Sequence, residues 1–265
     1  MHRNLSTRVK MRLGRAIPNA GYEARYRREM VRIIKSMHSD VLKEVGEFYS
    51  IELASDAKIT FTKLMAMLRK KWYKVFEQRA KQMARWLVET VGKRTKDNIM
   101  NQLKKIGFIV NPQYDVSEKE IMKDMISKNV KLIKSIPQKY LRAVQDVVNE
   151  AWERGGDVEY IVKNIKNMVS KKYKNAERRA ELIARDQLNK ITQQWAFHEA
   201  KACGATRGCW IHVPGEYTSR ITHIHMNKKD FDLNTGLYDE DVKRCVKPAE
   251  LPFCQCQCQF IFGEN

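Results

Sequence analysis

The sequence lacks the features that mark several large classes of protein. It has no run of eighteen or more uncharged apolar residues, which excludes a membrane-spanning helix. No apolar block follows the basic residues of its first twenty positions, so we expect no secretory signal. Its 12 glycines and 6 prolines are too few for a fibrous chain, and 43% hydrophobic residues leave too little polar bias for global disorder. We therefore expect a folded, soluble protein that is made in the cytoplasm.

Motifs of catalysis and of sequence-specific DNA recognition are also missing. The chain has no Gly-rich phosphate loop, no paired-carboxylate signature and no helix-turn-helix or finger pattern. His223 and His225 with Asp230 and Asp232 supply the residue types of a hydrolytic metal site, but nothing else in the sequence fixes a nucleophile. We expect a protein that is not an enzyme. The alternative is a metal-dependent nucleic-acid-processing enzyme with its site in the C-terminal part.

Positive charge is the strongest feature of the composition. Against 31 Asp and Glu stand 50 Lys and Arg, which gives a net charge of +19. The last 65 residues carry eight basic and eight acidic residues, so the whole excess lies in the first 200. This charge predicts double-stranded DNA as the partner. The protein would contact its phosphates, independently of sequence. The alternative is that Lys-rich helix faces only solvate the fold.

The basic excess is densest near the N-terminus. Residues 1–20 contain no acidic residue and include Gly14 and Pro18, so we predict a flexible arm there. The predicted DNA-binding residues are Arg3, Arg8, Lys10, Arg12, Arg15, Arg25, Arg27 and Arg28. No lipidation motif is present, and we expect no membrane partner.

Apolar residues recur at the helical period from Tyr22 to about residue 202. The pattern predicts an all-α domain over 21–202, with breaks at Gly92, at Pro137 and at Gly155–Gly156. From 203 to 265 the period disappears, and short strand-like pieces alternate with turns. We therefore predict a mainly α protein whose long-helix N-terminal domain is followed by a small Cys/His-rich α+β module.

All six cysteines and three of the six histidines lie in this small module. Thiolates and imidazoles are the ligands that zinc prefers, and a metal can stabilise a module with a thin core. The predicted ligands are His223, Cys245, Cys254 and Cys256, with four further candidates at Cys209, His212, His225 and Cys258.

The spacing of the cysteines leaves other interpretations open. No C-x-x-C pair is present. On a regular strand Cys254 and Cys256 would have Cα atoms about 6.5 Å apart, whereas two thiolates on one zinc lie about 3.8 Å apart. The pair can chelate only if the backbone turns there. Otherwise the cysteines are buried free thiols or, less compatibly with a reducing cytoplasm, disulfides.

The second half of the chain resembles a known family in several ordered pieces. Residues 129–165 are similar to the helical part of phage minor head proteins, the Mu F-like head morphogenesis family. The segment 180–186 (AELIARD) is similar to the helix A-x-x-I-A-R-T/D of that family, and 219–223 resembles its R-x-x-H piece. Gly204 and Trp210 lie between these two pieces, Met226–Asn227 follows them, and 252–256 (PFCQC) is similar to the family's terminal P-x-C-x-C.

This resemblance implies a minor capsid protein of a tailed bacteriophage that acts in head assembly near the portal. It implies the portal and major capsid proteins and packaged DNA as partners, and a place inside the virion after assembly in the host cytoplasm. From the residues themselves, we expect Arg185 and Arg220 to tie the last helix to the small module through acidic side chains or carbonyls, with Trp210 as a third structural residue.

Overall fold

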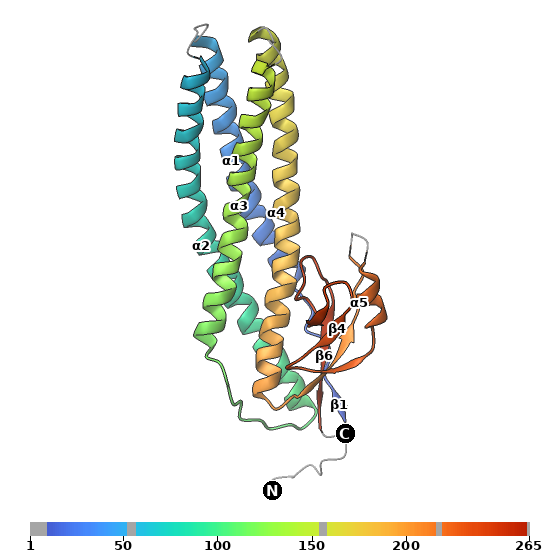
Figure 1. Cartoon of the computed structure of the whole chain (residues 1–265). Helices are drawn as coiled ribbons and strands as arrows, with labels where there is room; N and C mark the ends of the chain where they lie inside the picture. The colour runs from blue at the N-terminus through green and yellow to red at the C-terminus, as the bar shows by residue number, and fades with distance from the viewer. Residues whose placement is uncertain (1–9, 52–56, 154–157, 216–218, 264–265) are drawn as a thin grey trace. The chain divides into compact units, whose positions relative to one another are not determined.

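The computed structural model describes residues 10–51, 57–153, 158–215 and 219–263 (Figure 1). The protein is mainly α, as the sequence predicted, with four long helices followed by a small region of short strands. The long helices are α1 (Ala20–Ile51), α2 (Ala57–Lys105), α3 (Glu118–Glu153) and α4 (Val158–Ala202). None of the helices in the described residues contains an apolar stretch of the length needed to cross a membrane.

The remaining elements are short. They are β1 (Met11–Arg12), β2 (Arg207–Ile211), α5 (Ile221–His225), β3 (Asp230–Asp232), β4 (Leu237–Asp239), β5 (Arg244–Val246) and β6 (Gln257–Phe262). Four of the strands form an antiparallel sheet in the order β1-β6-β2-β3, and β4 pairs with β5. The central pair is β2 with β6, in which Trp210 lies opposite Cys258.

The long helices continue through the positions where the sequence predicted breaks at Gly92 and Pro137. Gly92 has a packing role, because a Cβ there would lie 2.6 Å from the ring of Trp195. Pro137 lies inside α3. The third predicted break, at Gly155–Gly156, falls outside the described residues.

The chain divides into two compact units whose boundaries differ from the predicted 21–202 and 203–265. One unit comprises Glu23–Trp86 and Ile126–Ala184, and the other comprises Met1–Tyr22, Leu87–Met125 and Arg185–Asn265. The described residues of the first unit are all helical, and its buried apolar side chains include Tyr26, Phe61 and Leu141. Inside this core the Tyr26 hydroxyl donates a hydrogen bond to Oδ1 of Asn129 at 3.0 Å.

The second unit combines the sheet with the adjoining turns of α2 and α4. Its core joins Ile99 and Leu103 of α2 and Ala196 and Ala200 of α4 to Trp210 and the aromatic residues of the strands. The small module therefore has no separate core of its own. It shares one with two long helices, which supplies the apolar area that some sixty loop-rich residues lack.

Residues 10–16 are held against the rest of the second unit, which differs from the flexible arm predicted over 1–20. Met11 and Arg12 pair with Phe262 and Ile261 of β6, and the amide of Leu13 donates to the carbonyl of Phe260 at 2.9 Å. Leu13 and Ala16 are buried. The sequence signal was misleading because a short edge strand of alternating charged and apolar residues resembles a solvated segment in composition. Residues 1–9 lie outside the described residues.

Candidate metal centre

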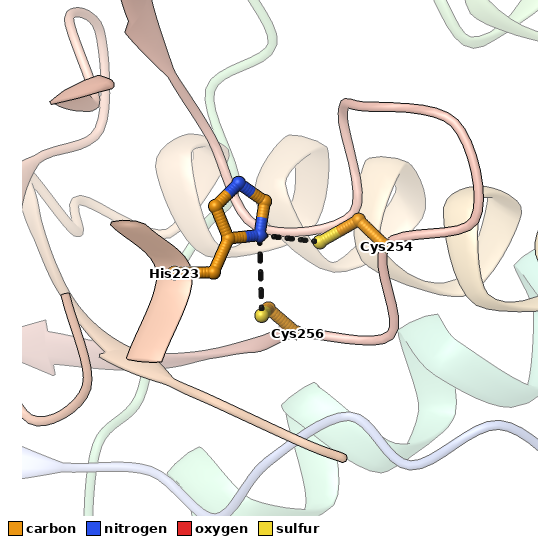
Figure 2. A group of neighbouring side chains, drawn as sticks. All are labelled: His223, Cys254 and Cys256. Atoms are coloured by element: carbon orange, nitrogen blue, oxygen red, sulfur yellow. Dashed lines mark hydrogen bonds between the residues drawn. The ribbon is translucent and has the colours of Figure 1, made fainter. Parts of the chain in front are cut away.

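Three side chains of the second unit converge on one buried point (Figure 2). The Nδ1 atom of His223, from α5, lies 3.4 Å from Sγ of Cys254 and 3.7 Å from Sγ of Cys256. The three ligand atoms lie within 4.8 Å of one another, and all three residues are buried. Figure 2 shows the imidazole nitrogen facing both sulfur atoms. These three residues, which we call the His-Cys-Cys cluster, were among the four predicted zinc ligands.

The two cysteines face the same point because the backbone turns immediately before β6. Phe253 has φ of 59°, in the left-handed region that a non-glycine residue adopts at a cost of about 1–2 kcal/mol. Its amide donates to Oδ1 of Asp186 in α4 at 2.6 Å, which stabilises this conformation. The regular strand begins only at Gln257. Cys254 and Cys256 therefore lie outside the regular strand, in the segment between the turn at Phe253 and β6, so the regular strand spacing that argues against chelation does not apply to them.

One face of α4 holds the turn through buried polar side chains. Asn189 donates through Nδ2 to the carbonyls of Cys254 and Cys256, at 2.9 and 3.4 Å. Gln193 accepts from the amide of Cys258 at 3.0 Å and donates to the carbonyl of Ala16 at 2.8 Å. Sequence reasoning missed both residues, although their spacing from Asp186 by three and seven positions on one helix face was a readable signal.

The second ring nitrogen of His223 contacts a buried carboxylate. Nε2 lies 3.1 Å from Oδ2 of Asp239, whose side chain is fully buried at the end of β4. Oδ1 of Asp239 accepts from the amide of Asp241 at 2.9 Å. Burial lowers the pKa of His223, but its hydrogen bond to Cys254 and the charges of Cys254 and Asp239 outweigh burial and raise it. Sequence reasoning did not single out Asp239.

The contact between the two thiols shifts their pKa values in opposite directions. A hydrogen bond from the Cys256 thiol lowers the pKa of Cys254, and the neighbouring His223 lowers it further against the effect of burial. The pKa of Cys256 is raised by the same pairing and by burial. One thiolate beside one imidazole is the arrangement that binds a soft or borderline cation.

The other predicted ligand, Cys245, is not part of the cluster. It lies exposed in β5, opposite Tyr238. His212, one of the further candidates, is instead brought near, with Nδ1 3.5 Å from Sγ of Cys256. Cys209 and Cys258 are buried in the paired strands β2 and β6. All six cysteines are free thiols, so the structure contains none of the disulfides considered from the sequence.

The residues of the alternative hydrolytic site are engaged separately. Asp230 forms ion pairs with Lys10 and Arg12 at 2.8 and 2.9 Å. Asp232 accepts hydrogen bonds from the two backbone amides that follow it at the β3 turn, those of residues 234 and 235. His225 is exposed. The described residues therefore do not bring this set together around His223.

The three predicted structural residues all lie in the second unit. Trp210 stands edge-on to the ring of His223, with centroids 5.1 Å apart. Arg220 donates to the carbonyl of Pro252 at 3.1 Å. Arg185 is partly buried in α4, next to Asp186.

The predicted DNA-binding residues have different environments. Lys10 and Arg12 are paired with Asp230, and Arg27 forms an ion pair with Glu181 at 2.7 Å. The guanidinium of Arg25 lies 4.2 Å from the ring centroid of Trp86. Of the other four predicted residues, Arg15 and Arg28 are exposed, and Arg3 and Arg8 lie outside the described residues.

Comparison with known proteins gives one weak relationship to a protein of unspecified role. The chain is 26% identical over 212 residues to an uncharacterized protein of Haemophilus influenzae, an alignment that covers 77% of this chain and 45% of that protein. The chain thus spans less than half the length of this relative. No protein-family model matches the chain, and no solved structure gives a significant match.

Proposed function

We propose that this protein is a minor capsid protein of a tailed bacteriophage, which acts in head assembly near the portal and contacts packaged DNA without sequence preference. Its partners in this proposal are the portal and major capsid proteins, and its final location is the capsid interior. In this proposal the protein acts by binding and not by catalysis, and the separate engagement of Asp230 in ion pairs and of Asp232 in a turn supports this part of it.

The observation that carries the proposal is the convergence of the motif residues. Four of the pieces that resemble head morphogenesis proteins, those with Asp186, Trp210, Arg220 and Pro252, come together near His223, although Asp186 and its partner Phe253 are 67 positions apart. The remaining long piece, 129–165, belongs to the first unit. Asp186 binds the turn before Cys254, Arg220 binds the carbonyl of Pro252, and Trp210 packs on His223. Asn227 accepts from the amide of His212 at 3.0 Å. Chance matches scattered along a chain have no reason to form one network, so this convergence supports treating them as a single motif.

The charge distribution supports the DNA part of the proposal. The basic excess is confined to the first 200 residues, whereas the last 65, which include the His-Cys-Cys cluster, are neutral. Several basic side chains remain exposed, among them Arg15 and Arg28. Contacts of this kind bind phosphates and position DNA without reading bases.

The proposal is tested by asking whether the protein is part of the particle. A strain that carries the gene with an affinity tag is induced, particles are purified on a density gradient, and their proteins are quantified by mass spectrometry. We expect the protein at a few copies per portal in mature particles or in their empty precursors. A strain deleted for the gene is the matched control and should yield fewer DNA-filled heads. Absence of the protein from both kinds of particle, with normal head yield in the deletion strain, would overturn the proposal.

A further inference from the structure

We infer that the His-Cys-Cys cluster is a zinc site whose fourth ligand is His212 and not Cys245, and that Asp239 orients the His223 ligand. The site is thus Cys254, Cys256, His223 and His212. This assignment rests on geometry in the second unit and does not depend on the proposed capsid role.

The distances between the candidate ligand atoms fit a tetrahedral zinc. With Zn–S of about 2.3 Å and Zn–N of about 2.0–2.1 Å, the nitrogen-to-sulfur edge of the tetrahedron is about 3.6 Å. The three such edges in the structure measure 3.4 Å for His223 and Cys254, 3.7 Å for His223 and Cys256, and 3.5 Å for His212 and Cys256. Both sulfur atoms therefore lie at the separation from His223 that one ion imposes, and His212 lies at that separation from one of them.

The environment of His223 supports a metal more than a buried thiol cluster. A histidine ligand presents a lone pair to the metal on one nitrogen and commonly donates its other N–H to a carboxylate. His223 presents Nδ1 to both sulfur atoms, while Nε2 contacts the fully buried Asp239. A buried carboxylate costs free energy unless a cationic or strongly polarised partner faces it, and a zinc-bound imidazole is such a partner.

The choice of fourth ligand follows from position in the fold. His212 is the first residue after β2, is half-buried, and has its amide fixed by Oδ1 of Asn227. It is close to Cys256 but not within the 4.8 Å that joins all three members of the cluster, so its imidazole turns toward Cys254 and His223 when the ion binds. Cys245 is exposed in the β4-β5 hairpin. With His212 as the fourth ligand, the protein supplies all four ligands of the ion, as it does in structural zinc sites.

Zinc at this point would join three segments that are short and rich in turns. They are the end of β2, the five-residue helix α5 and the turn before β6. The free energy of zinc binding contributes directly to the stability of the folded state. The ion would therefore add to the stabilisation that the shared apolar core gives this part of the sheet.

The experiment measures metal content and ligand type in the full-length protein. Protein purified under reducing conditions without chelator is analysed for zinc by mass spectrometry, and zinc-edge X-ray absorption identifies the neighbouring atoms. We expect about one zinc per chain, bound by two sulfur and two nitrogen atoms. Absence of zinc, with no uptake of Co²⁺ by the metal-free protein, would overturn the site. A shell with three sulfurs would overturn His212 as the fourth ligand.

Variants separate the two candidate fourth ligands. His212→Ala should lower zinc affinity by at least tenfold and weaken the visible bands of tetrahedral Co²⁺, whereas Cys245→Ser, the matched control, should bind as the wild type does. Asp239→Asn should lower affinity by about 10–100-fold while keeping the same four ligands. Since Asp239 is buried, circular dichroism establishes that the variant is folded before titration. Loss of zinc in Cys245→Ser with retention in His212→Ala would contradict the assignment.

Discussion

At the scale of single residues, Asn189 links helix α4 to the cluster. Its side chain is 1% exposed, and its amide group donates to the carbonyls of Cys254 and Cys256. Without that donor, buried carbonyls lose a partner that water cannot easily replace, and an unsatisfied buried polar group costs about 1–3 kcal/mol. The positions of the two cysteines thus depend on a side chain 65 residues earlier in the chain.

Replacing Asn189 with Ala should therefore destabilise the protein by about 1–3 kcal/mol. The free energy of unfolding is measured by urea denaturation under reducing conditions. Gln194→Ala, at an exposed position of the same helix, is the matched control and should change stability by less than about 0.5 kcal/mol. Equal effects of the two substitutions would show that the Asn189 hydrogen bonds add nothing.

Glu199 is a second buried residue with a testable role. Its side chain is fully buried, Oε2 accepts from the Tyr114 hydroxyl at 3.1 Å, and Oε1 lies 3.8 Å from the Lys96 ammonium. Burial raises the pKa of Glu199, although Lys96 opposes the rise. The folded protein therefore holds this proton more tightly than the unfolded chain does. The stability that this provides is full below the unfolded pKa of about 4.3 and is lost as pH rises through the folded pKa.

Glu199→Gln should remove this pH dependence. We expect the unfolding free energy of the variant, relative to wild type, to increase between about pH 4 and pH 8, because only the wild type must bury a carboxylate at the higher pH. Urea unfolding at both pH values measures the difference. Glu89→Gln, at an exposed position in α2, is the control and should show no such trend. A relative stability that falls with pH would mean that the pairing with Lys96 outweighs burial.

The metal cluster shows which residue-level features sequence can and cannot predict. Three of the four predicted ligands lie together, His223 in α5 and Cys254 and Cys256 in the segment just before β6. Cys245 was indistinguishable from them by residue type. Its exposure follows from the orientation of the β4-β5 hairpin, and the approach of His212 follows from the register of β2 on β6. Both depend on tertiary packing, which residue spacing does not encode.

At the scale of elements, Gly92 shows how packing overrides a local signal. Glycine commonly ends a helix, and the sequence predicted a break there. In the structure α2 continues through this position, and the indole of Trp195 occupies the space that a side chain would need. Trp195 is held in place by a hydrogen bond from Nε1 to the carbonyl of Val88 at 3.1 Å. The helical period predicted the helices themselves, since it reflects burial along each one, but it did not predict which of them are continuous.

Two glycine substitutions should therefore change stability in opposite directions. Gly92→Ala places a Cβ 2.6 Å from the fixed Trp195 ring, and such overpacking costs about 1–3 kcal/mol. Gly46→Ala, in α1, meets no atom within 4 Å and should gain up to about 1 kcal/mol from helix propensity. Both variants are compared by thermal and urea unfolding. A stabilising Gly92→Ala would mean that the contact with Trp195 is not tight in solution.

At the scale of the whole molecule, part of the N-terminal basic region has a structural role. Residues 10–16 are structural, because Met11 and Arg12 form β1, and Leu13 and Ala16 enter the core of the second unit. Removing residues 1–20 would therefore take away an edge strand along with the basic side chains. The contribution of the first residues to DNA binding has to be tested by substitution, which leaves β1 intact.

Replacing Arg3 and Arg8 with Gln should reduce the salt dependence of DNA binding in a defined way. Each phosphate contact contributes about 0.9 to the slope of log K against log salt concentration, so loss of two contacts lowers the slope by about two. Binding is measured by fluorescence anisotropy on two duplexes of unrelated sequence, which should give equal affinities. The control Lys228→Gln with Lys229→Gln removes the same charge from exposed positions in the neutral C-terminal part and should leave the slope unchanged. Equal slopes for both double variants would show that only net charge matters. In that case the first residues hold no phosphate contacts of their own, and the basic excess acts through the helices.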